Sequence, residues 1–470
     1  MDIFQQQQQQ QSASPKEVLE SMAAKQGLDL LGRAFADHLD NIDPLKGMRD
    51  RFLFPRVADQ MHVEGIQAEG EEECIYLCGN SLGLQPKTTK DKVVEVLDAW
   101  AKLAINSHFH GPLPAAYCDN YGREVLGELV GADPSQVVLM NALTVNLHLL
   151  LLAFYQPTET RYKILIEGHA FPSDRYAVAS QMRLKGLDPE EAMLQVRPRP
   201  GEHTIRTEDI LQLLKEKGPS IAVVCLSGVQ YYTGQKFDME RVTKAAQEQG
   251  CVVGWDLAHA VGNVELKLDE WGVDFACWCT YKYLNSGAGC LGGSYVNARH
   301  NERSQPRLQG WWSNRKETRF EMREYCDRDS TVDGFRISNP PPLLVGCVLA
   351  SLELFREAGM THLLQKQFLL TGYLELLIKH YFGRGDSDSP AVTIITPEDT
   401  SQRGCQLSLI FSSPLKQVHK EITKRGIMCD IRQPNVMRIA PAPLYNSFCD
   451  IHQFVTILGN VFALCKIEAA

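Results

Sequence analysis

Five short apolar runs, separated by segments with helical periodicity, occupy the stretch between about residues 76 and 295. Strands that are apolar along their whole length, rather than at alternate positions, are buried on both faces. Their alternation with helices predicts a parallel or mixed sheet covered by helices, the α/β class. The predicted strands are VVLMN at 137–141, KILIE at 163–167, IAVVCLS at 221–227, CVVGW at 251–255 and FACWC at 275–279.

The pattern changes on both sides of this stretch, which indicates separate domains. Residues 1–15 hold a glutamine run and predict a disordered tail, and residues 16–75 are expected to pack with a second domain. We place a large domain at 76–335 and a smaller α+β domain at 336–470, because 470 residues are too many for one core. Helices are expected near 16–39, 343–357, 361–381 and 415–425, and strands near 392–396, 405–411 and 437–441.

Charge and cysteine content exclude several classes of partner. The net charge is −9 with Lys and Arg scattered, which argues against nucleic acid and anionic membranes, since both require a basic face. The fourteen cysteines are spread through apolar runs with no signal peptide before them, so we expect a reducing compartment, the cytoplasm. Neither Cys74 with Cys78 nor Cys277 with Cys279 has a second pair at zinc-site spacing, so no metal is predicted.

The apolar stretch 137–155 is long enough to raise the question of a membrane span. It contains polar residues that disfavour such a span, and it predicts a strand, a turn and a helix instead.

The residues that follow the predicted strands are candidates for a binding site, because ligands in open α/β sheets bind beyond the carboxyl ends of the strands. The first strand leads to Thr144, which we interpret as a helix N-cap able to bind an anion or simply to cap the helix. The second leads to Phe171 and Asp174, which could stack on and pair with a flat cationic ring, or could form an ordinary capped turn. The third ends at Ser227, which is a weak signal by itself.

The last two strands carry the sharper signals. Asp256 stands directly at the end of a buried strand, with His259 three residues later. Burying an unpaired carboxylate costs several kcal/mol, so it requires a partner, either a pyridinium nitrogen or an arginine or helix end. Lys282 follows the fifth strand and suits an amine that forms an imine, although lysines are frequent at strand ends. Together the strand ends predict a pyridoxal 5′-phosphate enzyme that acts on an amino acid, with Lys282 covalently bound.

A glycine-rich stretch at 287–292 matches the dinucleotide-binding pattern GxGxxG. That pattern requires a following helix, whereas GGSYV at 292–296 reads as a strand. The structural context therefore argues against a nicotinamide enzyme.

Nine motifs in order resemble the kynureninase family, fold-type I pyridoxal phosphate enzymes related to the class V aminotransferases. The resemblance implies a large domain with a mostly parallel seven-stranded sheet between helices, a smaller α+β domain and a homodimer. It implies hydrolysis of the Cβ–Cγ bond of L-kynurenine or 3-hydroxy-L-kynurenine to anthranilate or 3-hydroxyanthranilate plus L-alanine, in tryptophan catabolism and NAD biosynthesis. The motifs are LCGNSLGLQP at 77–86, NALTVNLHLLL at 141–151, EGHAFPSDRYA at 167–177, LSGVQYYTGQ at 226–235, GWDLAHAVGN at 254–263, TYKYLNSG at 280–287, GWW at 310–312, FRISNPP at 335–341 and MRIAPAPLYNSF at 437–448.

The same resemblance implies residue roles. Lys282 binds the cofactor covalently, Asp174 and Asp256 pair with its ring nitrogen, and Tyr281 is the candidate proton donor. The remaining cofactor contacts implied are Leu143, Thr144, Phe171, Pro172, Ser173, Ser227 and His259, with Trp311 and Asn339 coming from the partner subunit. The substrate contacts implied are Arg438 for the carboxylate and Ser81, His108 and Asn339 near the aryl group.

Three other functions remain as alternatives at this point. A cysteine desulfurase or selenocysteine lyase would place a histidine before the lysine and a cysteine on a glycine-rich loop, whereas here Tyr281 precedes Lys282. An aminotransferase would transfer the amino group to a keto acid. A non-catalytic binding protein of the same fold would be expected to lack Lys282 or Asp256.

Overall fold

The computed structural model describes residues 13–301, 306–383 and 391–469, and divides the chain into two compact units. Unit 1 comprises residues 1–87, 232–235 and 354–470, and unit 2 comprises residues 88–231 and 236–353. The predicted glutamine tail lies outside the described residues except at its end, where Ser14 already caps a helix. The domain boundaries expected from the sequence, at 75/76 and 335/336, stay a proposal.

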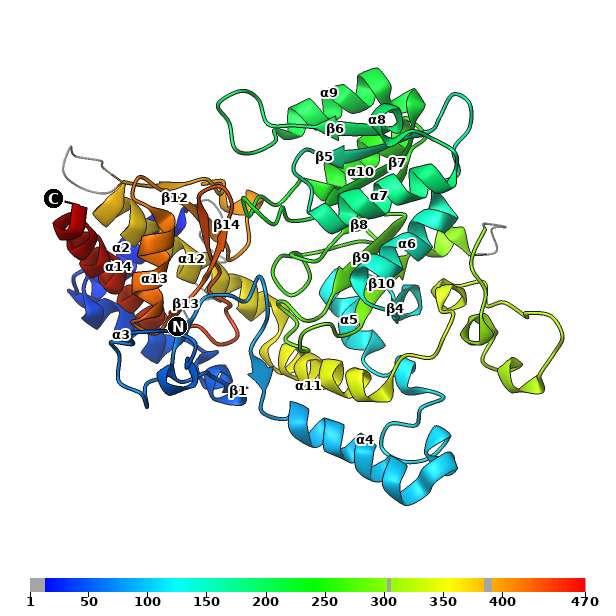
Figure 1. Ribbon diagram of the computed structural model, residues 1–470, viewed down its shortest axis with the longest axis horizontal. Coiled ribbons are helices and arrows are strands. Elements are labelled where there is room, and N and C mark those ends of the chain that lie inside the picture. Colours follow the sequence, from blue (N-terminus) through cyan, green and yellow to red (C-terminus); the bar gives the residue numbers. More distant parts are fainter. Residues whose placement is uncertain (1–12, 302–305, 384–390, 470) are drawn as a thin grey trace. The chain divides into compact units, whose positions relative to one another are not determined.

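Unit 2 is built on a seven-stranded sheet in the order β4-β10-β9-β8-β7-β5-β6 (Figure 1). Strands β5 to β9 pair in parallel, and only β10 runs antiparallel to its neighbours. The five predicted strands are confirmed, and the sheet is the mostly parallel one expected. The strands are β4 (Val137–Leu139), β5 (Lys163–Glu167), β6 (Met193–Val196), β7 (Ile221–Ser227), β8 (Val252–Asp256), β9 (Phe275–Cys279) and β10 (Gly292–Val296).

The central strands are buried on both faces, as their unbroken apolar sequences require. Two glycines make room for large rings on neighbouring strands. Gly254 is paired with Phe275 and Gly293 with Trp278, and a Cβ at either glycine would lie within 2.3 Å of the facing ring. Ring packing between strands therefore requires glycine at both positions.

Helices accompany the strands of unit 2 (Figure 1). Helix α6 follows β4 as predicted, and its leucines pack with the strands in one hydrophobic core. The helices are α4 (Thr89–Leu103), α5 (Arg123–Val130), α6 (Leu143–Phe154), α7 (Pro172–Leu184), α8 (Pro189–Ala192), α9 (Thr207–Lys217), α10 (Met239–Glu248) and α11 (Pro342–Ala358), the last of which ends in unit 1.

Unit 1 contains an antiparallel four-stranded sheet in the order β11-β12-β15-β14 with a helical layer and its own core. Its α+β character matches the sequence prediction. The helices are α2 (Pro15–Gln26), α3 (Arg33–Ile42), α12 (Met360–Phe382), α13 (Leu415–Thr423) and α14 (Phe448–Ala469); the strands are β1 (Phe52–Leu53), β2 (Ile75–Tyr76), β3 (Gln85–Pro86), β11 (Val392–Ile394), β12 (Leu407–Phe411), β13 (Ile427–Met428), β14 (Asp430–Arg432) and β15 (Val436–Ile439).

The helical periodicity of residues 16–39 corresponds to two helices, α2 and α3. Gly27 adopts a left-handed conformation, with φ of 63°, and ends α2. Glycine tolerates this conformation because it has no Cβ, and α3 starts only at Arg33. Within the described ranges, we find no helix with both the length and the apolar character needed to cross a membrane.

Candidate active site

A cavity of about 250 Å³ lies at the carboxyl ends of the parallel strands of unit 2. This is where a doubly wound sheet binds its ligands. Ten residues predicted from the sequence line it together: Leu143, Thr144, Phe171, Ser173, Asp174, Ser227, Asp256, His259, Tyr281 and Lys282.

Two predicted carboxyl groups face each other in this cavity. Asp256 is the last residue of β8, and its Oδ1 accepts a hydrogen bond from the backbone N–H of Ala258 at 2.8 Å. Asp174 lies in the first turn of α7, where burial and then the charge of Asp256 raise its pKa well above the ordinary value. The Oδ1 atom of Asp174 is buried and has no hydrogen-bond partner among the described residues. A cationic ring N–H is the donor that such a group requires, so this pair fits the ring nitrogen of pyridoxal phosphate.

The predicted lysine points at the same cavity. Lys282 follows β9, and its Nζ lies 3.0 Å from Nε2 of His259. The same Nζ lies 5.9 Å from the ring centroids of Phe171 and Tyr281. Burial raises the pKa of the Tyr281 hydroxyl, so this side chain keeps its proton at neutral pH. An amine, an aromatic face and a proton donor are thus brought together.

Two helix starts supply the anion-binding groups. The structure corrects one detail here, because α6 starts at Leu143 with Ala142 as its N-cap, so Thr144 is not the cap. Instead, Thr144 Oγ1 lies 2.7 Å from Oγ of Ser173 in the first turn of α7. The first backbone N–H groups of a helix have no partners within it and favour negative charge. Two hydroxyls and two helix N-termini therefore fit a phosphate group.

Sequence reasoning missed Glu167 and Tyr231, which also line the cavity. Glu167 ends the apolar strand β5 in the same way that Asp256 ends β8, so the signal that identified Asp256 was present there too. Tyr231 contacts Phe171, with ring centroids 5.2 Å apart. Tyr231 lies in a polar loop, and no pattern in the sequence of that loop indicates a binding role comparable to that of a carboxylate at a strand end.

Other predicted residues do not line the cavity. Pro172 begins α7 beside it. Trp311, His108 and Asn339 belong to unit 2, and the Trp311 side chain is 48% exposed, with Nε1 donating to the carbonyl of Arg319 at 2.7 Å.

The last two predicted substrate residues, Ser81 and Arg438, belong to unit 1. Arg438 lies on β15 and is almost fully buried. Its Nε donates to Oδ1 of Asp430 at 2.7 Å, so the guanidinium plane is held by a carboxylate of the neighbouring strand β14.

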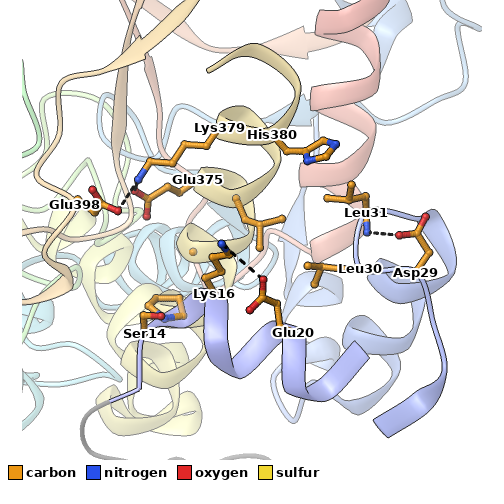
Figure 2. A pocket seen from close by; sticks show the side chains of 13 residues that line it. Ser14, Lys16, Glu20, Asp29, Leu30, Leu31, Glu375, Lys379, His380 and Glu398 are labelled. Atoms are coloured by element: carbon orange, nitrogen blue, oxygen red, sulfur yellow. Dashed lines mark hydrogen bonds and ion pairs between the residues drawn. The ribbon is translucent and has the colours of Figure 1, made fainter. Parts of the chain in front are cut away.

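A larger cavity, of about 570 Å³, lies within unit 1 beside α2 and α12 (Figure 2). Its charged groups pair with one another: Lys16 with Glu20 at 3.7 Å, and Lys379 with Glu375 at 2.7 Å and Glu398 at 2.8 Å. None of the residues predicted to carry chemistry lines it. We therefore assign the active site to the smaller cavity in unit 2.

Comparison with known proteins shows which family this chain belongs to. The family model described as aminotransferase class-V matches residues 75–385, and the model described as kynureninase C-terminal domain matches residues 363–458. Kynureninase of Homo sapiens is 49% identical over 95% of this chain and 97% of its own length. Kynureninase of Nematostella vectensis is 48% identical over 95% of this chain and 98% of its own length, and that of Myxococcus xanthus is 47% identical over 90% and 96%.

Solved structures support the fold alone. The cysteine desulfurase CsdA from Escherichia coli superimposes with a TM-score of 0.68 at 17% identity, covering 89% of this chain and 98% of that one. The predicted fold-type I architecture is therefore confirmed. The family matches also confirm the predicted cofactor, pyridoxal phosphate. With nearly its whole length matched at almost half identity, this chain belongs to the kynureninase family.

Proposed function

We propose that this protein hydrolyses the Cβ–Cγ bond of L-kynurenine and 3-hydroxy-L-kynurenine, releasing anthranilate or 3-hydroxyanthranilate and L-alanine. The supporting observation is that one cavity contains the amine of Lys282 and the two carboxyl groups of Asp174 and Asp256. This reaction would serve tryptophan catabolism and the synthesis of NAD, in the cytoplasm. The described cysteines, which form no disulfide among themselves, agree with a reducing compartment.

The residues of the cavity divide the chemistry among them. When bound, pyridoxal phosphate supplies a protonated ring that accepts the electron pair released from the substrate. Asp256 and Asp174 would hold the proton on its ring nitrogen, and Phe171 would lie against the ring. Lys282 would hold the cofactor covalently, and its amine, with His259 at 3.0 Å to orient it, would take the α-proton of the substrate. Leu143, Thr144, Ser173 and Ser227 bind the polar substituents of the cofactor.

The substrate would be bound by groups outside this set. Arg438 binds the substrate carboxylate, because a guanidinium offers two parallel N–H donors that match a carboxylate. Asp430 holds that guanidinium in a fixed plane. His108, Asn339 and Ser81 are the positions proposed to contact the aryl group.

The function is tested by product release. Protein supplied with pyridoxal phosphate should convert L-kynurenine into equal amounts of fluorescent anthranilate and L-alanine, both measured by chromatography. The same measurement with 3-hydroxy-L-kynurenine ranks the two substrates. Release of sulfide from L-cysteine with no anthranilate from L-kynurenine would instead favour the desulfurase alternative.

Tyr281→Phe tests the proposed proton donor. The raised pKa of Tyr281 keeps its hydroxyl protonated, so its loss should lower kcat by about 10²-fold while KM changes little. Steady-state kinetics on L-kynurenine measures both constants. Tyr231→Phe, which removes the hydroxyl of another tyrosine lining the cavity, is the matched control. Full turnover by Tyr281→Phe would show that the proton comes from another group.

We also propose a homodimer, supported by the exposed apolar surface of unit 2. The 15-residue helix α4 has no buried residue, and its Val94, Leu97 and Trp100 are 42%, 40% and 67% exposed. An amphipathic helix with its apolar side chains in solvent is unfavourable unless a partner covers it. Trp311, proposed to reach the partner's active site, is also exposed.

Trp100→Asp should therefore weaken the dimer. Sedimentation of the wild-type chain is expected at twice 52.7 kDa, and the variant should shift toward the monomer at equal concentration. Lys90→Asp, at an exposed polar position of the same helix, should leave the dimer intact. A wild-type chain that sediments as a monomer would contradict the proposal.

A further inference from the structure

Glu167 is a buried carboxyl group in the active-site cavity to which the proposed chemistry gives no role. It ends β5 and is only 3% exposed. Both of its oxygens accept hydrogen bonds from Ser227: Oε1 from the hydroxyl at 2.6 Å and Oε2 from the backbone N–H at 3.3 Å. One side chain thus holds both the side chain and the backbone of Ser227.

This contact lies beyond the last residues that pair β5 with β7. The paired residues of β5 and β7 end at Leu165 and Val224, so Glu167 continues the link between the two strands beyond the ladder. On its other side, Ser227 is the direct partner of Asp256 on β8, and the N–H of Gly228 donates to the carbonyl of Asp256 at 2.7 Å. Glu167 therefore contacts the residue of β7 that is paired with Asp256.

The charges of the cavity support a role beyond linking two strands. Three carboxyl groups, those of Glu167, Asp174 and Asp256, line one cavity of about 250 Å³ together with Lys282 and His259. Burial raises the pKa of Glu167, and the charge of Asp256 acts in the same direction. Burial of a carboxyl group at such a site is unfavourable unless hydrogen bonds compensate for it. An amide would bond the serine hydroxyl without that cost.

We propose that Glu167 is a positioning residue of the cofactor site. Its two oxygens hold Ser227 in place, and Ser227 in turn positions Asp256 beside the ring nitrogen. The inference rests on the proposed function for the identity of the cofactor. It adds that three residues at neighbouring strand ends act together: Glu167 holds Ser227, and Ser227 positions the carboxylate of Asp256 beside the ring nitrogen.

The test uses Glu167→Gln, Ser227→Ala and the double variant in the full-length protein. Glutamine retains one acceptor oxygen but replaces the other with an NH2 group, which cannot accept from the backbone N–H. Alanine removes only the hydroxyl, so it keeps the test decisive if Glu167→Gln folds poorly. We expect each single variant to weaken pyridoxal phosphate binding about 10-fold or more and to shift the visible absorption of the bound cofactor. The double variant should lose little more than the weaker single one, because both changes remove the same contact.

The controls separate positioning from stability. Glu191→Gln, at an exposed position outside the cavity, should change nothing. Glu167→Gln could instead lower only the melting temperature, with the cofactor dissociation constant and kcat within about twofold of wild type and the absorption spectrum unchanged. In that case Glu167 has a purely structural role and the inference is overturned. If the wild-type protein itself binds no pyridoxal phosphate, the proposed function fails, and the role of Glu167 fails with it.

Discussion

Lys282→Ala is expected to abolish turnover of L-kynurenine, with kcat reduced by more than about 10³-fold. The substitution removes both the covalent attachment of the cofactor and the base that takes the α-proton. The fold should survive, because the amine of Lys282 lies in a cavity, where it contacts His259, and is not part of a hydrophobic core. Loss of activity is therefore a loss of chemistry.

The measurement is the visible spectrum followed by borohydride reduction and mass spectrometry. Wild-type protein should be yellow and should retain one reduced cofactor on the peptide that contains Lys282, whereas the variant should retain none. Lys185→Ala, at an exposed lysine after α7, is the matched control and should behave as wild type. A wild-type protein that stays colourless and unmodified by borohydride would contradict the assignment of the active site.

Asp256→Asn is expected to lower kcat by about 10²- to 10³-fold while the protein stays folded. Asparagine has the same size, and its oxygen can still accept from the N–H of Ala258, but it carries no negative charge to hold a proton on the ring nitrogen. The loss should appear in kcat more than in KM, because the charge acts on the electron pair released during the reaction.

Asp174→Asn provides the informative comparison. Burial and then the charge of Asp256 raise the pKa of Asp174 well above its ordinary value, so the charged form of this carboxyl is disfavoured and a neutral amide resembles its protonated form. We therefore expect a smaller loss of kcat than for Asp256→Asn, measured under identical conditions. Asp188→Asn, which affects only the helix cap of α8, controls for general effects of the change. Equal losses at 174 and 256 would mean that the two carboxyl groups share the charge equally.

Continuous apolar runs were sufficient to predict five of the strands of the sheet, β4, β5, β7, β8 and β9. The edge strand β6 was missed, because its sequence MLQV is short and three of its four residues are only half-buried. The long C-terminal helix α14 was also missed, and its apolar residues pack in the core of unit 1. Edge and terminal elements depend more on what covers them than on their own pattern.

The active-site residues show the same difference between what the sequence predicts and what only the structure shows. Asp256 and Lys282 could be predicted because Asp256 ends a buried strand and Lys282 lies shortly after another, and a charged side chain next to such a strand requires a partner. Glu167 offers the same signal, and only the distance to Ser227 gives it a role. The sequence alone determined which side chains stand at the strand ends and in which order along the chain.

What only the tertiary structure decided is which of those side chains meet. Thr144 follows β4 and Ser173 follows β5, and these strands are separated by four others in the sheet, yet their hydroxyls lie 2.7 Å apart. The direction in which α6 leaves its strand brings them together, and that direction depends on packing against the other helices and strands. Local sequence encodes periodicity and burial, whereas strand order and helix placement arise from contacts between segments far apart in the chain.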